Sequence, residues 1–144
     1  MSQILIAHRG NTNGKQPSSE NEPSHINTVL DCGYDVEIDV RLLEGRWYLG
    51  HDIPQYHVNL EFLKKTGLWC HAKNLEALKG MLAENIHCFW HQNDDYTLTS
   101  QGYIWSYPGI ETDSKTICLM PEISGRTSTH SYGICSDFVE RYRI

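Results

Sequence analysis

Three groups of charged or titratable side chains occur within residues 6–52, and each accompanies an apolar run of the kind that forms a buried strand. The groups are His8 with Arg9, Glu37 with Asp39, and His51 with Asp52. The first and third groups end their apolar runs, whereas Glu37 and Asp39 stand two residues apart inside the second. Because alternate strand residues point to the same side, Glu37 and Asp39 are expected on one face. The pattern indicates a functional site.

These side chains suit proton transfer combined with cation binding. An imidazole titrates near pH ~6.5, so one of two histidines can accept a proton while the other donates one at neutral pH. Two carboxylates on one strand face present hard oxygen ligands suited to Mg²⁺ or Ca²⁺. Buried side by side, Glu37 and Asp39 would repel each other, and a bound cation would remove that cost.

The length and composition bound the classes of protein that fit this chain. With 144 residues and 40% hydrophobic side chains, it suits a single domain over residues 1–144. A net charge of −6 argues against a nucleic-acid partner. No apolar stretch approaches the roughly 18 residues of a membrane span. The first apolar run leads directly into His8, which predicts a strand and not a signal peptide, and the five scattered cysteines suit buried thiols. A cytoplasmic protein is expected.

Short apolar runs alternate with helical or polar segments along the chain. The expected main strands are Ile4–Ala7, Tyr34–Leu42, Leu68–Lys73, Ile86–Gln92, Tyr103–Tyr107, Thr116–Met120 and Tyr132–Cys135, with Trp47–Leu49 forming a hairpin. A helix is expected from Pro23 to Gly33, a short one after Asn59, and a clear one after Asn74, in which Leu75, Leu78 and Leu82 share a face. This alternation predicts parallel strand pairing and an α/β fold.

Four motifs, in this order and spacing, resemble the glycerophosphodiester phosphodiesterase family. They are His8-Arg9-Gly10, Glu20-Asn21, Glu37-Ile38-Asp39-Val40 and His51-Asp52, with weaker echoes in Leu68–Asn74 and Gly133–Phe138. The barrels of that family share their general architecture with phosphatidylinositol phospholipases C. The motifs cover the first third of the chain.

The resemblance implies a TIM-type (β/α) barrel, and the length implies that this barrel is pared down. Such barrels usually take about 250 residues. Residues 92–103 are too short for a full crossover helix, so helices are expected to be missing or shortened on one side. Apolar surface exposed there would favour a homodimer.

The resemblance also implies roles for individual residues. His8 and His51 become the general acid and base, Glu37 and Asp39 metal ligands, and Arg9 and Lys73 the cations that hold phosphate oxygens. Alternatively, Arg9 and Lys73 merely neutralise the two carboxylates in an internal salt-bridge network.

One departure from the family concerns the third metal ligand. The family usually has a glutamate two residues before the lysine, whereas this chain has His71-Ala72-Lys73. An imidazole ligand at His71 would shift the preference from Mg²⁺ or Ca²⁺ toward Mn²⁺, Zn²⁺ or Fe²⁺. Alternatively, Glu122 supplies the missing carboxylate.

Two functional hypotheses follow. The first is a metal-dependent hydrolase that acts on a glycerophosphodiester or a similar small polar phosphodiester by two-histidine acid–base catalysis. The second is a catalytically weak relative that binds phosphorylated ligands or a partner protein. Both histidines, both carboxylates and both cations are present, which favours the enzyme. Further candidates for substrate contact near strand ends or in a loop are His91, Trp105, Tyr107 and Arg126.

Overall fold

The computed structural model describes residues 3–125 and 130–143, and a ten-stranded mixed sheet forms its framework. The strands are β1 (Ile4–His8), β2 (Asp35–Leu43), β3 (Arg46–Leu49), β4 (Tyr56–Val58), β5 (Leu68–Ala72), β6 (Cys88–Phe89), β7 (Tyr96–Leu98), β8 (Ile104–Ser106), β9 (Thr116–Leu119) and β10 (Gly133–Ser136). The helices of the described residues are α1 (Pro23–Asp31), α2 (Leu60–Leu63), α3 (Leu75–Ala83), α4 (Pro121–Ser124) and the 3₁₀-helix η1 (Val139–Tyr142).

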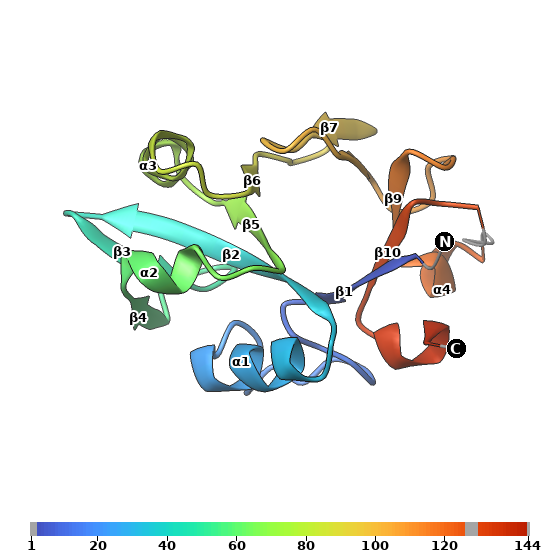
Figure 1. The fold of residues 1–144 in the computed structure, drawn as a ribbon, viewed down its shortest axis with the longest axis horizontal. Coiled ribbons are helices and arrows are strands. Elements are labelled where there is room, and N and C mark those ends of the chain that lie inside the picture. The colour runs from blue at the N-terminus through green and yellow to red at the C-terminus, as the bar shows by residue number, and fades with distance from the viewer. Residues whose placement is uncertain (1–2, 126–129, 144) are drawn as a thin grey trace.

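The parallel part of the sheet has the order β6-β5-β2-β1-β10-β9-β8. The hairpin strands β3 and β4 extend from β2, and β7 pairs with β8, all of them antiparallel. Figure 1 shows the strands curving around one centre, with α1, α2 and α3 on the outer side. The C-terminal ends of the parallel strands therefore gather at one end of the sheet.

The prediction of a TIM-type (β/α) barrel is wrong, because the sheet forms a half-barrel with four short α-helices in the described chain. A TIM barrel needs a covering helix after each of eight parallel strands. Here β6 has two residues, an antiparallel strand (β7) takes the place of a crossover helix before β8, and α4 has four residues. Among the described residues, no strand pairing joins β6 to β7 or β8. The second half of the chain thus lacks the helices that would complete the barrel.

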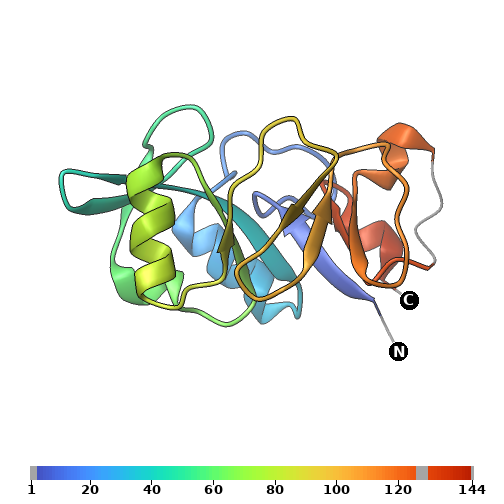
Figure 2. The same ribbon diagram turned by 90° about the horizontal axis from the view of Figure 1, so that it is seen from above.

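The helices with clear sequence signals form where expected. The side chains of Asn59 and Asn74 cap α2 and α3 by accepting hydrogen bonds from the backbone N–H groups three residues on. The expected apolar face of α3 is wrong for Leu75 and Leu82, which are exposed, whereas Leu78 packs partly buried against the core. The fully buried residues of α3 are Ala77 and Met81. Figure 2 shows α1, α2 and α3 gathered over the half of the sheet formed by the first part of the chain.

The alternation of side chains along the strands divides the apolar residues into two clusters. Val36, Ile38 and Val40 of β2 lie in the outer cluster, which is shared with α1 and α3. The inner cluster contains Ile6 and Trp69, together with Phe89, Trp105, Ile117 and Cys135. Glu37 and Asp39 alternate with the outer residues, so they lie on the inner face of the curved sheet. Strand periodicity thus carries two acidic side chains into the interior.

His87 precedes β6 and provides a test of stability against pH. Burial lowers its pKa to about 4, and a backbone hydrogen bond at Leu68 offsets only part of that effect. Between pH ~6.5 and ~4 the unfolded chain therefore binds more protons, so the free energy of unfolding falls as the pH falls. Glutamine does not titrate, so His87→Gln should make this fall in the free energy of unfolding smaller by about 1–2 kcal/mol. This figure is discounted because His87 is partly exposed to solvent.

Urea titrations at pH 7, 5.5 and 4.5 measure this effect, with the exposed His57→Gln as the matched control. Parallel curves of stability against pH for the parent and His87→Gln would contradict the prediction.

Candidate functional site

A small pocket of about 110 Å³ lies at the C-terminal ends of the parallel strands. We call it the site pocket. It is lined by His8, Arg9, Glu37, Asp39, His51, His71, His91, Trp105, Tyr107, Pro108 and Leu119. Both predicted catalytic histidines, both predicted carboxylate ligands and the third-ligand candidate His71 thus lie around one cavity. These residues lie up to 63 positions apart in the sequence, and β1, β2, β5 and the loop after β3 bring them together.

Glu37, Asp39 and His71 form a compact cluster at the base of the site pocket. Asp39 of β2 pairs in register with His71 of β5, which places both side chains on the inner face. One ligand atom from each residue lies within 4.8 Å of the others. The Nδ1 atom of His71 is 3.7 Å from Glu37 Oε2 and 3.6 Å from Asp39 Oδ1. These separations exceed hydrogen-bonding distance but suit three atoms arranged around a shared cation.

The backbone of His91 fixes the tautomer of His71. The Nε2 atom of His71 lies 2.9 Å from the His91 carbonyl oxygen. A carbonyl oxygen can only accept, so Nε2 carries a hydrogen and donates it. In the neutral ring, Nδ1 then presents its lone pair to the two carboxylates. This orientation is the one required of a metal-ligating histidine held by an outer hydrogen bond.

Asp39 is held by Asn21, yet it keeps one oxygen without a hydrogen-bond partner. The side chain of Asn21 donates to Asp39 Oδ2 at 3.0 Å and accepts from the Asp39 backbone N–H at 2.9 Å. Asp39 Oδ1 is buried and has no hydrogen-bond partner in the described structure, and the same is true of Arg9 Nε. Arg9 Nε lies 3.5 Å from Asp39 Oδ2. A buried carboxylate oxygen without a partner is costly, so the site has a position that a cation would satisfy.

The two carboxylates have opposite pKa shifts. Burial raises the pKa of Glu37, but contact with His71 and the charges of His8 and Arg9 outweigh that effect and lower it below the ordinary value. Burial and the neighbouring charge of Glu37 raise the pKa of Asp39, with partial compensation from Asn21. Like charges held this close cannot both ionise freely. The pair therefore titrates as a unit in the absence of a cation.

His8 is oriented by a buried carboxylate from the other end of the chain. Its Nδ1 lies 2.8 Å from Asp137 Oδ1, and Asn11 Nδ2 donates to the same oxygen at 2.9 Å. The remaining ring nitrogen, Nε2, lies 3.8 Å from Glu37 Oε1. Burial lowers the pKa of His8, but the hydrogen bond with Asp137 and the charges of Glu37 and Asp137 raise it overall. The imidazole is thus fixed with Nε2 toward the metal-ligand cluster.

His51 reaches the site pocket from the loop after β3. Gly50 has φ +152, and a Cβ at that position would lie 1.9 Å from the Ile53 carbonyl oxygen, so only glycine fits this turn. The guanidinium of Arg41 donates to the carbonyl oxygens of Gly50 and His51. Asp52 lies 2.8 Å from His51 Nδ1, but this pair is exposed to solvent, unlike the pair of His8 and Asp137.

Two residues considered from the sequence, Lys73 and Glu122, are not among the described residues that line the pocket. Lys73 follows β5, and its charge contributes to a lowered pKa of Asp52, for which the hydrogen bond from His51 is the leading cause. Glu122 instead accepts hydrogen bonds from Ser136 and Tyr142. Arg126 lies outside the described residues. Within the described chain, neither Lys73 nor Glu122 therefore joins the Glu37/Asp39/His71 cluster.

Arg9 has the partners expected of an internal salt-bridge network as well as a place in the pocket. It pairs with Asp39 and, through Nη1 at 3.5 Å, with Glu20. Its backbone has φ +56, a strained conformation for a residue other than glycine, and its N–H donates to the Glu37 carbonyl. The alternative hypothesis was that Arg9 and Lys73 neutralise Glu37 and Asp39 in an internal salt-bridge network. The ion pair of Arg9 with Asp39 agrees with the part of that hypothesis that concerns Arg9.

His91, Trp105 and Tyr107 form part of the pocket wall, as their positions near strand ends predict. His91 is 8% exposed, and neither ring nitrogen has a hydrogen-bond partner in the described structure. The edge of its ring faces Tyr107, with centroids 5.9 Å apart. A buried imidazole with two unsatisfied nitrogens in a pocket wall suits contact with a bound polar group.

Sequence reasoning missed four supporting residues: Asn11, Asn21, Arg41 and Asp137. Asn21 and Asp137 lie within stretches that resemble the family, but the resemblance by itself implies no role for either residue. The sequence offers one signal for Asn11 and Asn21, namely a polar residue in a loop beside a site motif. Asp137 has no local signal, because it is 129 positions from His8.

Comparisons with protein-family models, with curated proteins and with solved structures found no match for this chain. None of the helices in the described residues combines the length and the apolar character that crossing a membrane requires.

Proposed function

We propose that this chain is a metal-dependent phosphodiester hydrolase, related to the glycerophosphodiester phosphodiesterases, that acts on a glycerophosphodiester or a similar small polar phosphodiester. The observation that carries the proposal is the placement of His8 and His51 in one pocket with the Glu37/Asp39/His71 cluster. Phosphodiester cleavage requires charge neutralisation, a proton acceptor and a proton donor. The site pocket contains groups suited to each requirement.

The donor set fits a divalent cation. Glu37 and Asp39 offer carboxylate oxygens, His71 offers Nδ1, and the unsatisfied Oδ1 of Asp39 is turned toward His71. A cation bound there would neutralise the charge of the phosphoryl group. Two carboxylates favour Mg²⁺ or Ca²⁺, while the imidazole extends the range to Mn²⁺ or Zn²⁺. The placement of Glu122 away from the cluster favours His71 as the third ligand.

His8 and His51 perform the two proton transfers in this proposal. One accepts the proton of the nucleophile, and the other donates a proton to the leaving alkoxide. Asp137 accepts from His8 Nδ1 and so keeps Nε2 available to the reacting groups. It is therefore a positioning residue. Asp52 contacts His51 Nδ1 in the same way, but this contact is exposed to solvent, where a water molecule can replace the carboxylate.

Arg9 and His91 are the proposed contacts to phosphoryl oxygens within the pocket, and Lys73 adds positive charge near its mouth. A guanidinium matches a phosphate with paired donors, and the buried ring of His91 has a nitrogen available for one hydrogen bond. The small volume of about 110 Å³ favours a compact polar substrate.

Hydrolysis of a panel of phosphodiesters tests the proposal. Glycerophosphocholine, glycerophosphoethanolamine and bis(p-nitrophenyl) phosphate would be incubated with Mg²⁺, Ca²⁺, Mn²⁺ or Zn²⁺, each with and without a chelator. We expect turnover that requires a metal and disappears with the chelator. Metal-dependent binding of these compounds without turnover would instead support the catalytically weak binding protein.

Asp137→Asn is expected to lower kcat by about 10²–10⁴-fold with little change in KM, because the amide favours the wrong tautomer of His8. The matched control is Asp52→Asn, which alters the equivalent but exposed contact of His51 and is expected to cost less than about tenfold. The dependence of kcat on pH separates positioning from folding, since the limb that reports His8 should shift only in Asp137→Asn. Equal losses in the two variants would contradict this role for Asp137.

A further inference from the structure

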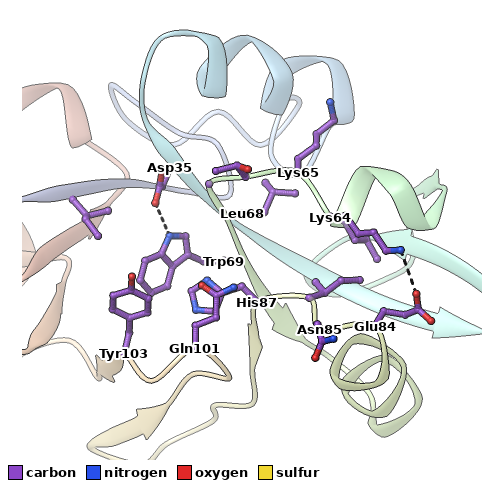
Figure 3. A pocket seen from close by; sticks show the side chains of 15 residues that line it. Asp35, Lys64, Lys65, Leu68, Trp69, Glu84, Asn85, His87, Gln101 and Tyr103 are labelled. Atoms are coloured by element: carbon purple, nitrogen blue, oxygen red, sulfur yellow. Dashed lines mark hydrogen bonds and ion pairs between the residues drawn. The ribbon is translucent and has the colours of Figure 1, made fainter.

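A second, larger cavity of about 500 Å³ lies at the opposite end of the sheet from the site pocket. We call it the basal cavity. Its lining comes from the N-terminal ends of the parallel strands, including Ile4, Asp35, Trp69 and Tyr103, and from residues 63–67 and 84–87. Figure 3 shows Asp35, Trp69, His87 and Tyr103 together at one end of this cavity, with Lys64 and Glu84 at the other. Its size is that of pockets for small organic ligands.

The carboxylate of Asp35 faces the basal cavity without a cationic partner. Asp35 Oδ2 accepts a hydrogen bond of 2.9 Å from the indole Nε1 of Trp69, as Figure 3 shows. No ion pair to Asp35 is formed by the described residues. Burial raises the pKa of Asp35, and the hydrogen bond from Trp69 only partly offsets this. A half-buried carboxylate that lacks a counter-charge favours a positively charged occupant.

The two lysines that border the cavity do not supply that counter-charge. Lys64 Nζ lies 3.3 Å from Glu84 and 3.7 Å from Glu61, so its charge is matched at the rim. Lys65 Nζ lies 5.8 Å from the centre of the Phe62 ring. Lys65 borders the cavity, but Figure 3 shows its amine pointing away from Asp35 and Trp69. The inner end of the cavity therefore keeps a net negative character.

Three aromatic rings cluster on the side of the cavity where Asp35 lies, as Figure 3 shows. The rings of Trp69 and Tyr103 are 4.9 Å apart, and that of His87 lies 4.4 Å from Trp69 and 5.5 Å from Tyr103. The faces of such rings carry partial negative charge and attract organic cations. A bare metal ion is disfavoured, because in the described residues the only group with at least three potential ligands is the Glu37/Asp39/His71 cluster.

We propose that the basal cavity binds a small organic ammonium compound, with its charged nitrogen on Asp35 and its apolar body against Tyr103 and the neighbouring side chains. The amine donates to the carboxylate, and the rings stabilise its positive charge. The site is independent of the proposed hydrolase activity, since it lies at the other end of the half-barrel and shares no lining residue with the site pocket.

Nitrogen–proton correlation spectra of the ¹⁵N-labelled protein test the proposal, with benzylammonium as the probe. The indole N–H of Trp69 bonds to Asp35 and therefore reports directly on this carboxylate; its signal is identified with Trp69→Phe. Benzylammonium is expected to shift the signal saturably, whereas benzyl alcohol and benzoate, which have the same ring, are not. Asp35→Asn keeps an acceptor for Trp69 and should weaken benzylammonium binding by about tenfold or more.

Glu84→Gln is the matched control, because it removes a carboxylate from the outer end of the same cavity, and it should leave the affinity unchanged. Asp39→Asn should also leave the affinity unchanged, whatever its effect on hydrolysis. Equal shifts with benzyl alcohol would show an apolar pocket, and stronger shifts with benzoate would show an anion site governed by the lysines. Each of these two results would overturn the proposal. So would an unaltered affinity of Asp35→Asn for benzylammonium, or the absence of any saturable shift.

Discussion

His8→Ala and His51→Ala are each expected to reduce kcat for phosphodiester hydrolysis by about 10²–10⁴-fold. Each substitution removes one of the two proton-transfer groups that line the site pocket. In the parent, the rate should follow a bell-shaped dependence on pH, because one histidine must be neutral while the other is protonated. The losses should not add, since either group is of little use without its partner, so the double variant should be nearly as active as the worse single variant.

An aryl phosphodiester distinguishes the acid from the base. Its leaving group needs little protonation, so it should restore the rate of the variant that lacks the general acid and not of the variant that lacks the base. His57→Ala, which alters an exposed histidine of β4 outside the pocket, is the matched control and should retain full activity. If neither site variant is rescued while metal is bound, the two-histidine assignment fails and the binding hypothesis becomes the better one.

Asp39→Asn is expected to weaken divalent-metal binding by about 10²-fold or more and to lower hydrolysis in parallel. The variant removes a charged ligand from the Glu37/Asp39/His71 cluster but retains an oxygen for the hydrogen bond from Asn21. Titration calorimetry with Mg²⁺, Ca²⁺, Mn²⁺ and Zn²⁺ measures the affinity. The increase in melting temperature on addition of metal, which should be present in the parent, should be lost in the variant.

Glu122→Gln is the matched control for metal binding. Its carboxylate bonds to Ser136 and Tyr142, so its removal should leave metal affinity unchanged. A loss of affinity in Glu122→Gln would return this residue to the ligand set. Equal affinity of Asp39→Asn and the parent would mean that Asp39 serves the salt bridge to Arg9 and not a cation.

The elements with strong local signals are predictable from the sequence. Pro23 begins α1, Asn59 and Asn74 cap α2 and α3, and the apolar run at residues 4–7 forms most of β1. The short strands β4 and β7 and the short helix α4 were not predicted, because three or four residues carry too little periodicity. The exposure of Leu75 and Leu82 was likewise unpredictable from spacing, because partners distant in sequence decide which face of α3 is covered.

Closure of the sheet was decided by the tertiary structure alone. The alternation of strands and helices predicted parallel pairing, the family resemblance implied a barrel, and residues 92–103 gave a local reason to expect helices missing or shortened on one side of it. Whether the remaining strands still meet depends on the lengths and tilts of all of them together. With two residues in β6 and an antiparallel β7, they form a half-barrel.

For the candidate site, the sequence determined which side chains share a strand face, because that follows from the two-residue period of a strand. Glu37 and Asp39 are together for this reason, and His71 joins them because β2 and β5 pair in register. The sequence could not determine that Asp137 orients His8, that Arg41 holds the His51 loop, or that Lys73 is absent from the pocket lining. Those relations join residues that are distant in the chain or lie in loops, and their distances are set by packing of the whole sheet and not by local spacing.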